Sequence, residues 1–447
     1  MKNIMICLER MEIGGVETSV INQAIEYKKQ GIKVIILAKE GIYVEKLKEY
    51  GIFFENFEFT LDENIDIQKI EKIKEIINKY KIEEVLINQI PCALSVFPAC
   101  FELKVPYVAY IHTSVEMIQD NENNVYDWFE KQLDITKYLL PIYFKKAKKV
   151  IAISQEAADY AIKRYNIKKE NVIVVKNSIN LDLYKTNKET NNKEKFLLIT
   201  RFSDEKMNSI KNAIEVFREY ENDNKSLSIV GSGPMQEKVE KLVKDDEKIK
   251  LLGSSNDVVP IIDEHDIVLG LDRTILEAIS MKKIAVIIGY NKPKQIITNK
   301  NIDIEANEGF SGLKLEDLTV KELVKRIKEE NIDLEYNYNY VKENLNIKDN
   351  IYIENDFSAD YKDSDLFEII EEIQMNKIKY EEEAKNLREN INSKIYEISE
   401  IEKELINVKN KNQELKEQND NIKKELLSLY ASKRYKYLNN ILKIFGK

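Results

Sequence analysis

Short apolar runs alternate with amphipathic helical patterns from the N-terminus to about residue 350. Runs such as KVIILAKE, VPYVAYIH and FLLITR are apolar almost throughout and lack a strict two-residue alternation of apolar and polar side chains. Strands of this kind, joined by helices, form parallel sheets that helices cover on both faces. The sequence therefore predicts an α/β fold.

A polar segment, YKTNKETNNKEK at residues 184–195, interrupts this alternation and has no apolar periodicity. We interpret it as a linker between an N-terminal domain at residues 1–183 and a second domain at residues 196–350. Both domains are expected to be Rossmann-like. The carboxyl ends of their strands would face each other across a cleft, where open α/β sheets bind ligands.

Composition excludes several classes of protein. Hydrophobic residues make up 43% of the 447, which is enough to build real cores. Neither an apolar run of about 18 residues nor a basic-then-apolar leader occurs, so we expect no membrane span and no signal peptide. The formal net charge of -9 argues against a general nucleic-acid binder.

Cysteines and histidines are few. Cys7, Cys92 and Cys100 lie in apolar surroundings without metal-ligand or redox spacing, so we expect buried thiols in a cytoplasmic protein. The 2 histidines, His112 and His265, are too few for histidine-rich metal chemistry, and we predict no bound metal. His112 ends an apolar strand and is either a cleft residue or a satisfied core histidine. His265 precedes a strand and is expected to be structural.

The stretch IGGVETSV places Gly14 and Gly15 between an apolar strand and an amphipathic helix. Glycines at this point let backbone N–H groups come close to a ligand above the sheet, and a diphosphate is a typical one. The alternative is a tight strand-to-helix turn in which glycine only relieves steric crowding.

Two cations follow the first strand of the second domain, in LLITRFSDEK. Arg201 leaves the strand and Lys206 comes five residues later, just before an amphipathic helix. A guanidinium and an ammonium at this place suit a diphosphate. The alternative is a pair of solvated charges partnered by Asp204 and Glu205.

A carboxylate lies close to the core of the second domain. Glu277, in TILEAIS, has apolar neighbours and begins a helix between two core strands. A carboxylate there needs a partner, and the hydroxyl pair of a ribose is a good one. The alternative is that Glu277 caps backbone N–H groups or pairs with Arg273.

From Met1 to around Asn350 the order of these motifs resembles glycosyltransferase family 4, which has the GT-B fold. The segments that carry the resemblance are IGGVETSV, YIHTS, VIAISQEAADYAIKRYNIKKENVIVVKNSIN, ITRFSDEK, IVGSGP, LLGSSNDV and ILEAIS. One such motif is weak evidence, but their shared order over most of the chain is specific.

The resemblance implies a retaining glycosyltransferase that takes a nucleotide-diphosphate sugar as donor substrate, a UDP-sugar being favoured, and needs no other cofactor. Gly15 would let the backbone approach the donor phosphates. Arg201 and Lys206 would stabilise the charge that grows on the leaving nucleoside diphosphate without a metal. Glu277 would hold the ribose.

Two further positions take their roles from the resemblance alone. The loop around Gly253 would lie beside the base, and His112 beside the donor sugar. The family retains the anomeric configuration of the sugar, and we identify no carboxylate in this chain that is placed to act as a nucleophile. By analogy with the family, this implies a front-face route through an oxocarbenium-like state.

The sequence departs from the family at one position. The family often has a second glutamate eight residues before the one matched by Glu277, where this chain has Leu269. Asp272 or Arg273 could substitute, or the sugar could be held differently. A catalytically degenerate GT-B scaffold that recruits partners at the membrane is therefore the alternative function, whereas a sugar-nucleotide epimerase is disfavoured.

The chain changes character after a connector at residues 351–365. From Leu366, glycine and proline are absent until Gly446. A heptad register fits Leu387, Ile391, Ile398, Ile401, Leu405, Val408, Leu415, Ile422, Leu426 and Leu429, with Lys394, Asn412 and Asn419 as polar exceptions. Asparagines at "a" positions favour a parallel dimer, so residues 366–430 are predicted to form a coiled-coil homodimer. The alternative is a single long helix packed on the enzyme.

Residues 431–447 form a basic, amphipathic tail. The stretch SKRYKYLNNILKIFGK carries basic residues, no acidic ones, and an apolar face at Leu438, Ile441, Leu442 and Phe445. It resembles an interfacial helix attracted to anionic lipid, which would place the enzyme at the inner face of the plasma membrane. Its acceptor would then be a cell-surface glycan or a lipid-linked sugar. A basic tail that merely ends the coiled coil is the alternative.

Overall fold

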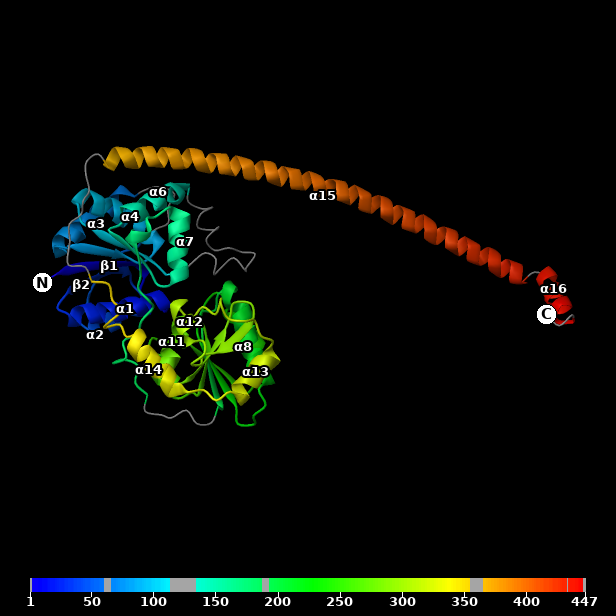
Figure 1. Ribbon diagram of the computed structural model, residues 1–447, viewed down its shortest axis with the longest axis horizontal. Coiled ribbons are helices and arrows are strands. Elements are labelled where there is room, and N and C mark those ends of the chain that lie inside the picture. The colour runs from blue at the N-terminus through cyan, green and yellow to red at the C-terminus, as the bar shows by residue number, and fades with distance from the viewer. Residues whose placement is uncertain are drawn as a thin grey trace. The chain divides into compact units, whose positions relative to one another are not determined.

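The computed structural model describes residues 2–59, 66–112, 134–186, 193–353, 365–431 and 433–444. The chain divides into two compact units, Met1–Ile373 and Gln374–Lys447. The first unit contains two sheets of mainly parallel strands with helices around them (Figure 1), which confirms the predicted α/β class.

The first sheet forms from the apolar runs of the N-terminal domain. Its strands are β1 (Asn3–Arg10), β2 (Lys33–Lys39), β3 (Phe53–Asn56), β4 (Glu84–Ile87), β5 (Tyr107–Ile111), β6 (Lys149–Ala152) and β7 (Val172–Val174). These described strands are all parallel and lie in the order β3-β2-β1-β4-β5-β6-β7. The inner strands are buried along most of their length, which explains their continuous apolar sequence.

Helices cover both faces of this sheet (Figure 1). They are α1 (Gly15–Lys29), α2 (Val44–Glu49), α3 (Ile67–Tyr80), α4 (Ile90–Leu103), α6 (Asp134–Lys146), α7 (Gln155–Tyr165) and the short 3-10 helix η2 (Lys169–Asn171). One core packs α3, α4, α6 and α7 on one face, and a second core packs α1 and α2 on the other. Asp66 and Ser154 cap α3 and α7 through their side chains and so fix where these helices begin.

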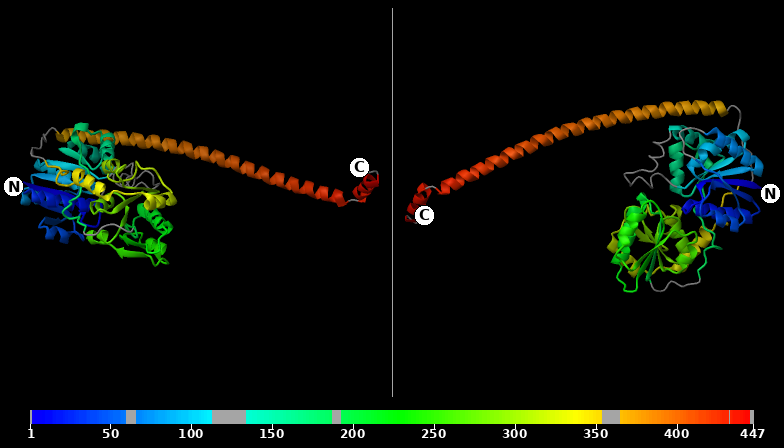
Figure 2. Two further views of the ribbon diagram at one scale, coloured as in Figure 1. Left: turned by 60° about the horizontal axis from the view of Figure 1, so that its bottom comes forward. Right: turned by 180° about the vertical axis from the view of Figure 1, so that it is seen from behind.

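The second domain repeats this plan. Its strands are β8 (Lys195–Ile199), β9 (Ser226–Val230), β10 (Ile249–Gly253), β11 (Ile267–Gly270), β12 (Ile284–Ile288) and β13 (Pro293–Ile296). They lie in the order β10-β9-β8-β11-β12-β13, and of these described strands β13 is antiparallel to its neighbour. The right-hand view of Figure 2 shows this sheet, in green, between helices.

The helices of the second domain pack in two layers. They are η3 (Asp204–Lys206), α8 (Met207–Glu219), α9 (Gln236–Val243), α10 (Val259–Asp263), α11 (Arg273–Ser280), α12 (Ile302–Asn307), α13 (Val320–Glu329) and α14 (Leu334–Asn344). Side chains of α8, α9 and α13 share one core, and those of α11 and α14 share the other. The sheet is therefore covered on both faces, as its apolar strands predict.

The described chain passes between the two domains at two places. Ile179 and Tyr184 are already buried in a core of the second domain, ahead of most of the polar segment at 184–195. After α14 the chain returns, and Tyr352 packs in a core of the first domain. The Tyr27 hydroxyl donates a hydrogen bond to the Tyr352 carbonyl at 2.5 Å. The C-terminal end of the second domain is thereby anchored to α1.

The second unit is helical. It consists of most of α15 (Asp365–Ala431) together with α16 (Lys433–Ile444). The predicted heptad side chains are exposed, for example Leu405 at 51% and Ile398 at 56%. A long helix thus occupies the expected place, while its pairing with a second helix stays a prediction. Among the described residues we find no helix with the length and apolar content of a membrane span.

Candidate functional site

Each sheet has a point at which the strand order reverses. In the first sheet this point lies between β1 and β4, and in the second it lies between β8 and β11. Open α/β sheets bind ligands in the crevice at the carboxyl ends of such strands. Gly14 and Asn88 follow β1 and β4, whereas Arg201 and Asp272 follow β8 and β11. The residues that the sequence predicts for a diphosphate therefore belong to these crevices.

The glycine pair contacts the second domain. Gly14 precedes α1 with an extended backbone, and no side chain caps the helix there. A Cβ atom on Gly14 would lie 2.1 Å from Glu17 Oε2 and 3.2 Å from Arg201 Nη2. A Cβ on Gly15 would lie 3.9 Å from the Cβ of Arg273, an ordinary contact. The uncapped N-terminus of α1 and two arginines of the second domain thus lie together.

The two predicted cations occupy different surroundings. Arg201 is exposed, and its Nη2 donates a hydrogen bond to the carbonyl of Ile13 at 3.2 Å. The Nζ of Lys206 lies 3.9 Å from Asp272 Oδ2 and 3.9 Å from the centre of the Tyr290 ring. Burial lowers the pKa of Lys206, but Tyr290 and Asp272 raise it by more, and the net pKa lies above its ordinary value. Lys206 is therefore a cation held beside a carboxylate from β11.

The expected partners of these cations lie elsewhere. Asp204 pairs with Lys238 at 3.9 Å, and Glu205 accepts a hydrogen bond from the Ser203 hydroxyl at 2.6 Å. The sequence offered Asp204 and Glu205 as local partners of Arg201 and Lys206. In the structure, the partner of Lys206 comes from the neighbouring strand.

Glu277 is buried and has two protein partners. Its Oε1 accepts a hydrogen bond from the Tyr184 hydroxyl at 2.8 Å and lies 3.3 Å from Nε of Arg273. Burial raises the pKa of Glu277, and Arg273 and Tyr184 oppose that rise. The pairing with Arg273 that the sequence left open is present. A role toward a ribose stays a prediction.

Arg273 is buried between the two domains. It is 5% exposed, and its Nη1 donates a hydrogen bond to the carbonyl of Ser178 at 3.1 Å. Within the described residues, Nη2 of Arg273 has no hydrogen-bond partner. A buried guanidinium N–H without a partner is unfavourable, so this atom could donate to a ligand oxygen.

Both histidines are held by the fold. His112 follows β5, with Nε2 2.9 Å from Asn88 Oδ1 and its ring stacked on Tyr110. Burial lowers the pKa of His112 from 6.5 to about 4, so the ring is neutral at physiological pH. The ring nitrogens of His265 lie 2.6 Å from the Ile261 carbonyl and 2.9 Å from the Ser228 hydroxyl. Both ring nitrogens of His265 are thus occupied by the fold, and its structural role stays a prediction.

A glycine turn supports the strand end that carries Arg201. A Cβ on Gly231 would lie 1.9 Å from the carbonyl oxygen of Thr200, and one on Gly233 would lie 2.5 Å from that of Phe202. The Gly231 N–H donates to the carbonyl of Gly253 at 2.9 Å. Gly253 has a φ of +74° and open space where a Cβ would stand. The turn IVGSGP therefore packs directly on the backbone beside Arg201.

Glu17 is a site residue that the sequence analysis missed. It is 5% exposed in the first turn of α1. The pKa of Glu17 lies above its ordinary value, because burial raises it by more than a backbone hydrogen bond, Arg201 and Gln89 lower it. The signal available in the sequence was an acidic residue three positions after Gly14, next to the apolar Val16 at the start of the predicted helix. The described residues contain no cluster of three or more His, Cys, Asp and Glu side chains that could hold a metal.

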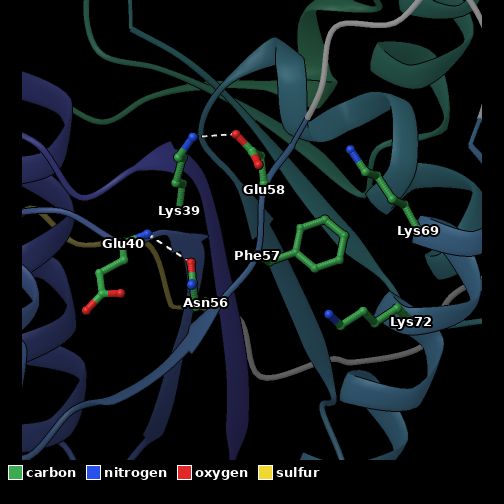
Figure 3. A pocket seen from close by; sticks show the side chains of 7 residues that line it. All are labelled: Lys39, Glu40, Asn56, Phe57, Glu58, Lys69 and Lys72. Atoms are coloured by element: carbon green, nitrogen blue, oxygen red, sulfur yellow. Dashed lines mark hydrogen bonds and ion pairs between the residues drawn. The ribbon is translucent and has the colours of Figure 1, made fainter.

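A pocket of about 480 Å³ lies at the carboxyl ends of β2 and β3 and the start of α3 (Figure 3). Its lining residues are Lys39, Glu40, Asn56, Phe57, Glu58, Lys69 and Lys72. Lys39 pairs with Glu58 across it. The Met11 N–H donates to the Lys39 carbonyl at 2.9 Å, which links this pocket to the loop before Gly14. The pocket is thus on the same edge of the first sheet as the glycine pair.

Residues 13–183 match the sequence model of Glycosyltransferase Family 4. No curated protein matches this sequence. Three similar solved structures are a glycosyltransferase from Rickettsia africae, HepE from Anabaena with UDP and glucose, and a sucrose-phosphate synthase from Thermosynechococcus elongatus. Their identities are 20%, 16% and 13%, with TM-scores of 0.54, 0.52 and 0.57. The alignments cover 77%, 76% and 78% of this chain and 94%, 98% and 96% of those chains. The fold is GT-B, as predicted.

Proposed function

We propose that this chain is a retaining glycosyltransferase that moves a sugar from a nucleoside-diphosphate donor, a UDP-sugar being favoured, to a cell-surface glycan or lipid-linked acceptor. The observation that carries the proposal is the meeting of Arg201 with the loop before Gly14, at the reversal points of both sheets. A diphosphate there would meet two cations and an uncapped helix N-terminus. HepE, a protein of similar fold, was crystallised with UDP and glucose.

In this proposal the leaving group is stabilised by fixed charges. Arg201 and Lys206 would balance the negative charge that develops on the diphosphate as the sugar departs, without a metal ion. Arg273 and Glu277 would bind the ribose side of the nucleotide, and the backbone at Gly253 would lie near the base. His112, neutral at physiological pH, would donate or accept a hydrogen bond with the sugar.

The proposed dimerisation and membrane binding both depend on the second unit. Two copies of α15 would pair in parallel along the exposed heptad stripe, and α16 would bind an anionic membrane surface at the inner face of the cell membrane. Leu438, Ile441 and Leu442 of α16 are exposed at 60%, 38% and 43%, which leaves an apolar face free to enter a lipid interface. Two tails on one dimer would strengthen the attachment.

A non-catalytic GT-B scaffold is the second candidate. The observation that favours it is Leu269, which lies fully buried on β11 where related enzymes often have a glutamate. Such a scaffold could still bind a nucleotide, but it would neither transfer a sugar nor hydrolyse a donor.

The first test is a thermal-shift screen of the full chain against UDP, GDP, ADP, CMP and dTDP. A nucleotide present at about 100-fold above its dissociation constant should stabilise the chain by roughly 2.7 kcal/mol. Arg201→Ala and Lys206→Ala should abolish the shift. Lys211→Ala, which removes an exposed lysine of α8, should leave it unchanged. Binding without any turnover of the matching nucleotide sugars favours the scaffold, and the absence of binding contradicts the proposed donor site.

A further inference from the structure

Asn88 lies at the point where the strand order of the first sheet reverses. It directly follows β4, and its N–H donates to the carbonyl of Cys7 on β1 at 2.9 Å. The side chain is 2% exposed, and its Oδ1 lies 2.9 Å from Nε2 of His112. His112 directly follows the neighbouring strand β5. The fold therefore holds these two side chains together at the carboxyl edge of the sheet.

The contact with Asn88 decides which ring nitrogen of His112 carries the hydrogen. The ring is neutral at physiological pH, because burial lowers its pKa from 6.5 to about 4. A neutral imidazole has one N–H donor and one acceptor nitrogen, whereas an amide oxygen only accepts. Nε2 of His112 is therefore the protonated nitrogen, and Nδ1 carries the lone pair. The ring of Tyr110, stacked on His112 with 5.8 Å between the ring centres, restrains the plane of the imidazole.

The amide nitrogen of Asn88 shows that the fold alone gives little reason for an asparagine here. Within the described residues, Nδ2 of Asn88 is buried and has no hydrogen-bond partner. A buried N–H without a partner is unfavourable, and an apolar side chain of similar size would avoid that cost. An apolar side chain would, however, leave Nε2 of His112 without its acceptor. The amide oxygen is thus the part of Asn88 that this site uses.

We propose that Asn88 is a positioning residue that fixes His112 as the Nε2–H tautomer, so that Nδ1 accepts a hydrogen bond from a hydroxyl group of the donor sugar. This inference rests on the proposed function, in which His112 lies beside that sugar. A hydroxyl group donates to an unprotonated imidazole nitrogen, whereas a protonated nitrogen can only donate. The partner of one ring nitrogen commonly sets the state of the other in this way. Asn88 therefore sets the direction of the hydrogen bond at His112.

His265 provides an internal reference, because its contacts require the opposite tautomer. Its Nδ1 lies 2.6 Å from the carbonyl oxygen of Ile261, which only accepts, and its Nε2 lies 2.9 Å from the Ser228 hydroxyl. Nδ1 of His265 must then carry the hydrogen. The two histidines of the chain are therefore expected to differ in tautomer.

The first experiment reads these tautomers directly. The chain has 2 histidines, so nitrogen-15 labelling of histidine in the full chain gives two sets of ring signals, which His112→Gln assigns. Long-range proton–nitrogen correlation spectra at pH 7.5 should show Nε2–H at His112 and Nδ1–H at His265. An Nδ1–H tautomer at His112 overturns the inference without any measurement of activity.

Asn88→Asp tests whether this tautomer matters for turnover. The aspartate keeps an acceptor oxygen for Nε2, but its charge raises the pKa of His112 and favours a ring with hydrogen on both nitrogens. Tyr110, the titratable side chain stacked on His112, stays neutral because burial raises its pKa. UDP-glucose, UDP-galactose and UDP-N-acetylglucosamine serve as donors. Release of UDP by this variant should stay near the wild-type rate at pH 8.5 and fall at least about tenfold below it at pH 6.

Asn88→Leu and Ser228→Ala complete the comparison. Asn88→Leu should lower turnover at both pH values, while its thermal shift with UDP should match that of the wild type, because the change acts on the sugar and not on the nucleotide. Ser228→Ala removes the hydroxyl partner of the other histidine and should leave turnover unchanged. Wild-type turnover by Asn88→Asp at both pH values overturns this inference alone. A wild-type chain that neither binds UDP nor releases it from a donor overturns the proposed function and the sugar contact with it.

Discussion

Burial is the dominant influence on Glu277 and its partners, and it outweighs charge in its effect on the pKa of Glu277. Arg273 and Glu277 are each 5% exposed, and Tyr184 donates to the same carboxylate oxygen that faces Arg273. A buried pair of this kind contributes little net stability as a whole, but removal of one partner leaves the other charge without compensation. The three side chains therefore behave as one unit.

Arg273→Met should destabilise the second domain by about 3–5 kcal/mol, because the Glu277 carboxylate is then buried without its cation. The double variant Arg273→Met with Glu277→Leu should recover much of that loss. Chemical denaturation of the two single variants and the double variant forms a double-mutant cycle. Additive effects in that cycle would show that the two residues do not act as a unit.

His112 provides a dependence of stability on pH. Its pKa is lowered from 6.5 to about 4 in the folded chain, so the folded ring stays neutral while the unfolded ring binds a proton below pH 6.5. The stability due to His112 is therefore complete above pH 6.5 and is lost as the pH falls toward 4, by at most about 3 kcal/mol. His112→Gln keeps a hydrogen-bond donor for Asn88 but does not titrate. Between pH 7.5 and pH 5 the melting temperature of this variant should fall by less than that of the wild type. Equal falls would contradict the assignment of this pH dependence to His112.

The positions of single residues at the candidate site could be predicted from the sequence, but their contact partners could not. The position of Arg201 and Lys206 beyond the end of a strand could be predicted from the apolar run that precedes them. The partner of Lys206 could not, because Asp272 follows β11 and the two residues meet only when β8 and β11 pair. Glu17 was missed for a similar reason, since it and Arg201 belong to different domains and both lie beside Gly14 only in the folded chain.

At the scale of elements, the buried strands were predictable, as were the edge strands β7 and β10, whereas the edge strands β3 and β13 were not. Neither β3 nor β13, each at one outer edge of its sheet, contains a continuous apolar run. Residues of β3 are exposed or only partly buried, and β13 contains Pro293. An edge strand need not be apolar throughout and tolerates proline, so its sequence lacks the signal that inner strands carry.

The turns at the strand ends differ in how closely their backbones pack on neighbouring atoms. Alanine substitutions at three glycines test this difference. Gly231→Ala should cost about 3 kcal/mol or more, because its Cβ would meet the fixed carbonyl of Thr200. Gly14→Ala should cost about 1 kcal/mol, because the Glu17 carboxylate can move aside. Gly253→Ala should cost a similar amount through its positive φ alone. Thermal unfolding of the three variants gives the order, and an equal cost at Gly231 and Gly253 would refute the tight packing beside Arg201.

At the scale of the whole molecule, the two-sheet plan could be read from the alternation of apolar runs and helices. The contacts between the domains could not, because they join residues far apart in the chain, such as Tyr27 with Tyr352. The heptad pattern predicted the long helix α15, which the structure contains. A pattern of exposed apolar residues along one stripe of a helix also predicts association with another helix.

The assembly proposed for α15 depends on that stripe. Substitutions at two adjacent residues, one on the stripe and one off it, test this dependence. Leu405 occupies a heptad "a" position and is 51% exposed, whereas Ile406 lies off the stripe and is 57% exposed. Leu405→Asp would place a charge in the middle of the paired helices and should convert the dimer to a monomer. Ile406→Asp adds the same charge on the outer surface and should leave the dimer intact. Sedimentation equilibrium of the full chain measures both, and the nucleotide thermal shift of either variant should match that of the wild type. A wild-type monomer, or a dimer that survives Leu405→Asp, would mean that the stripe serves another contact.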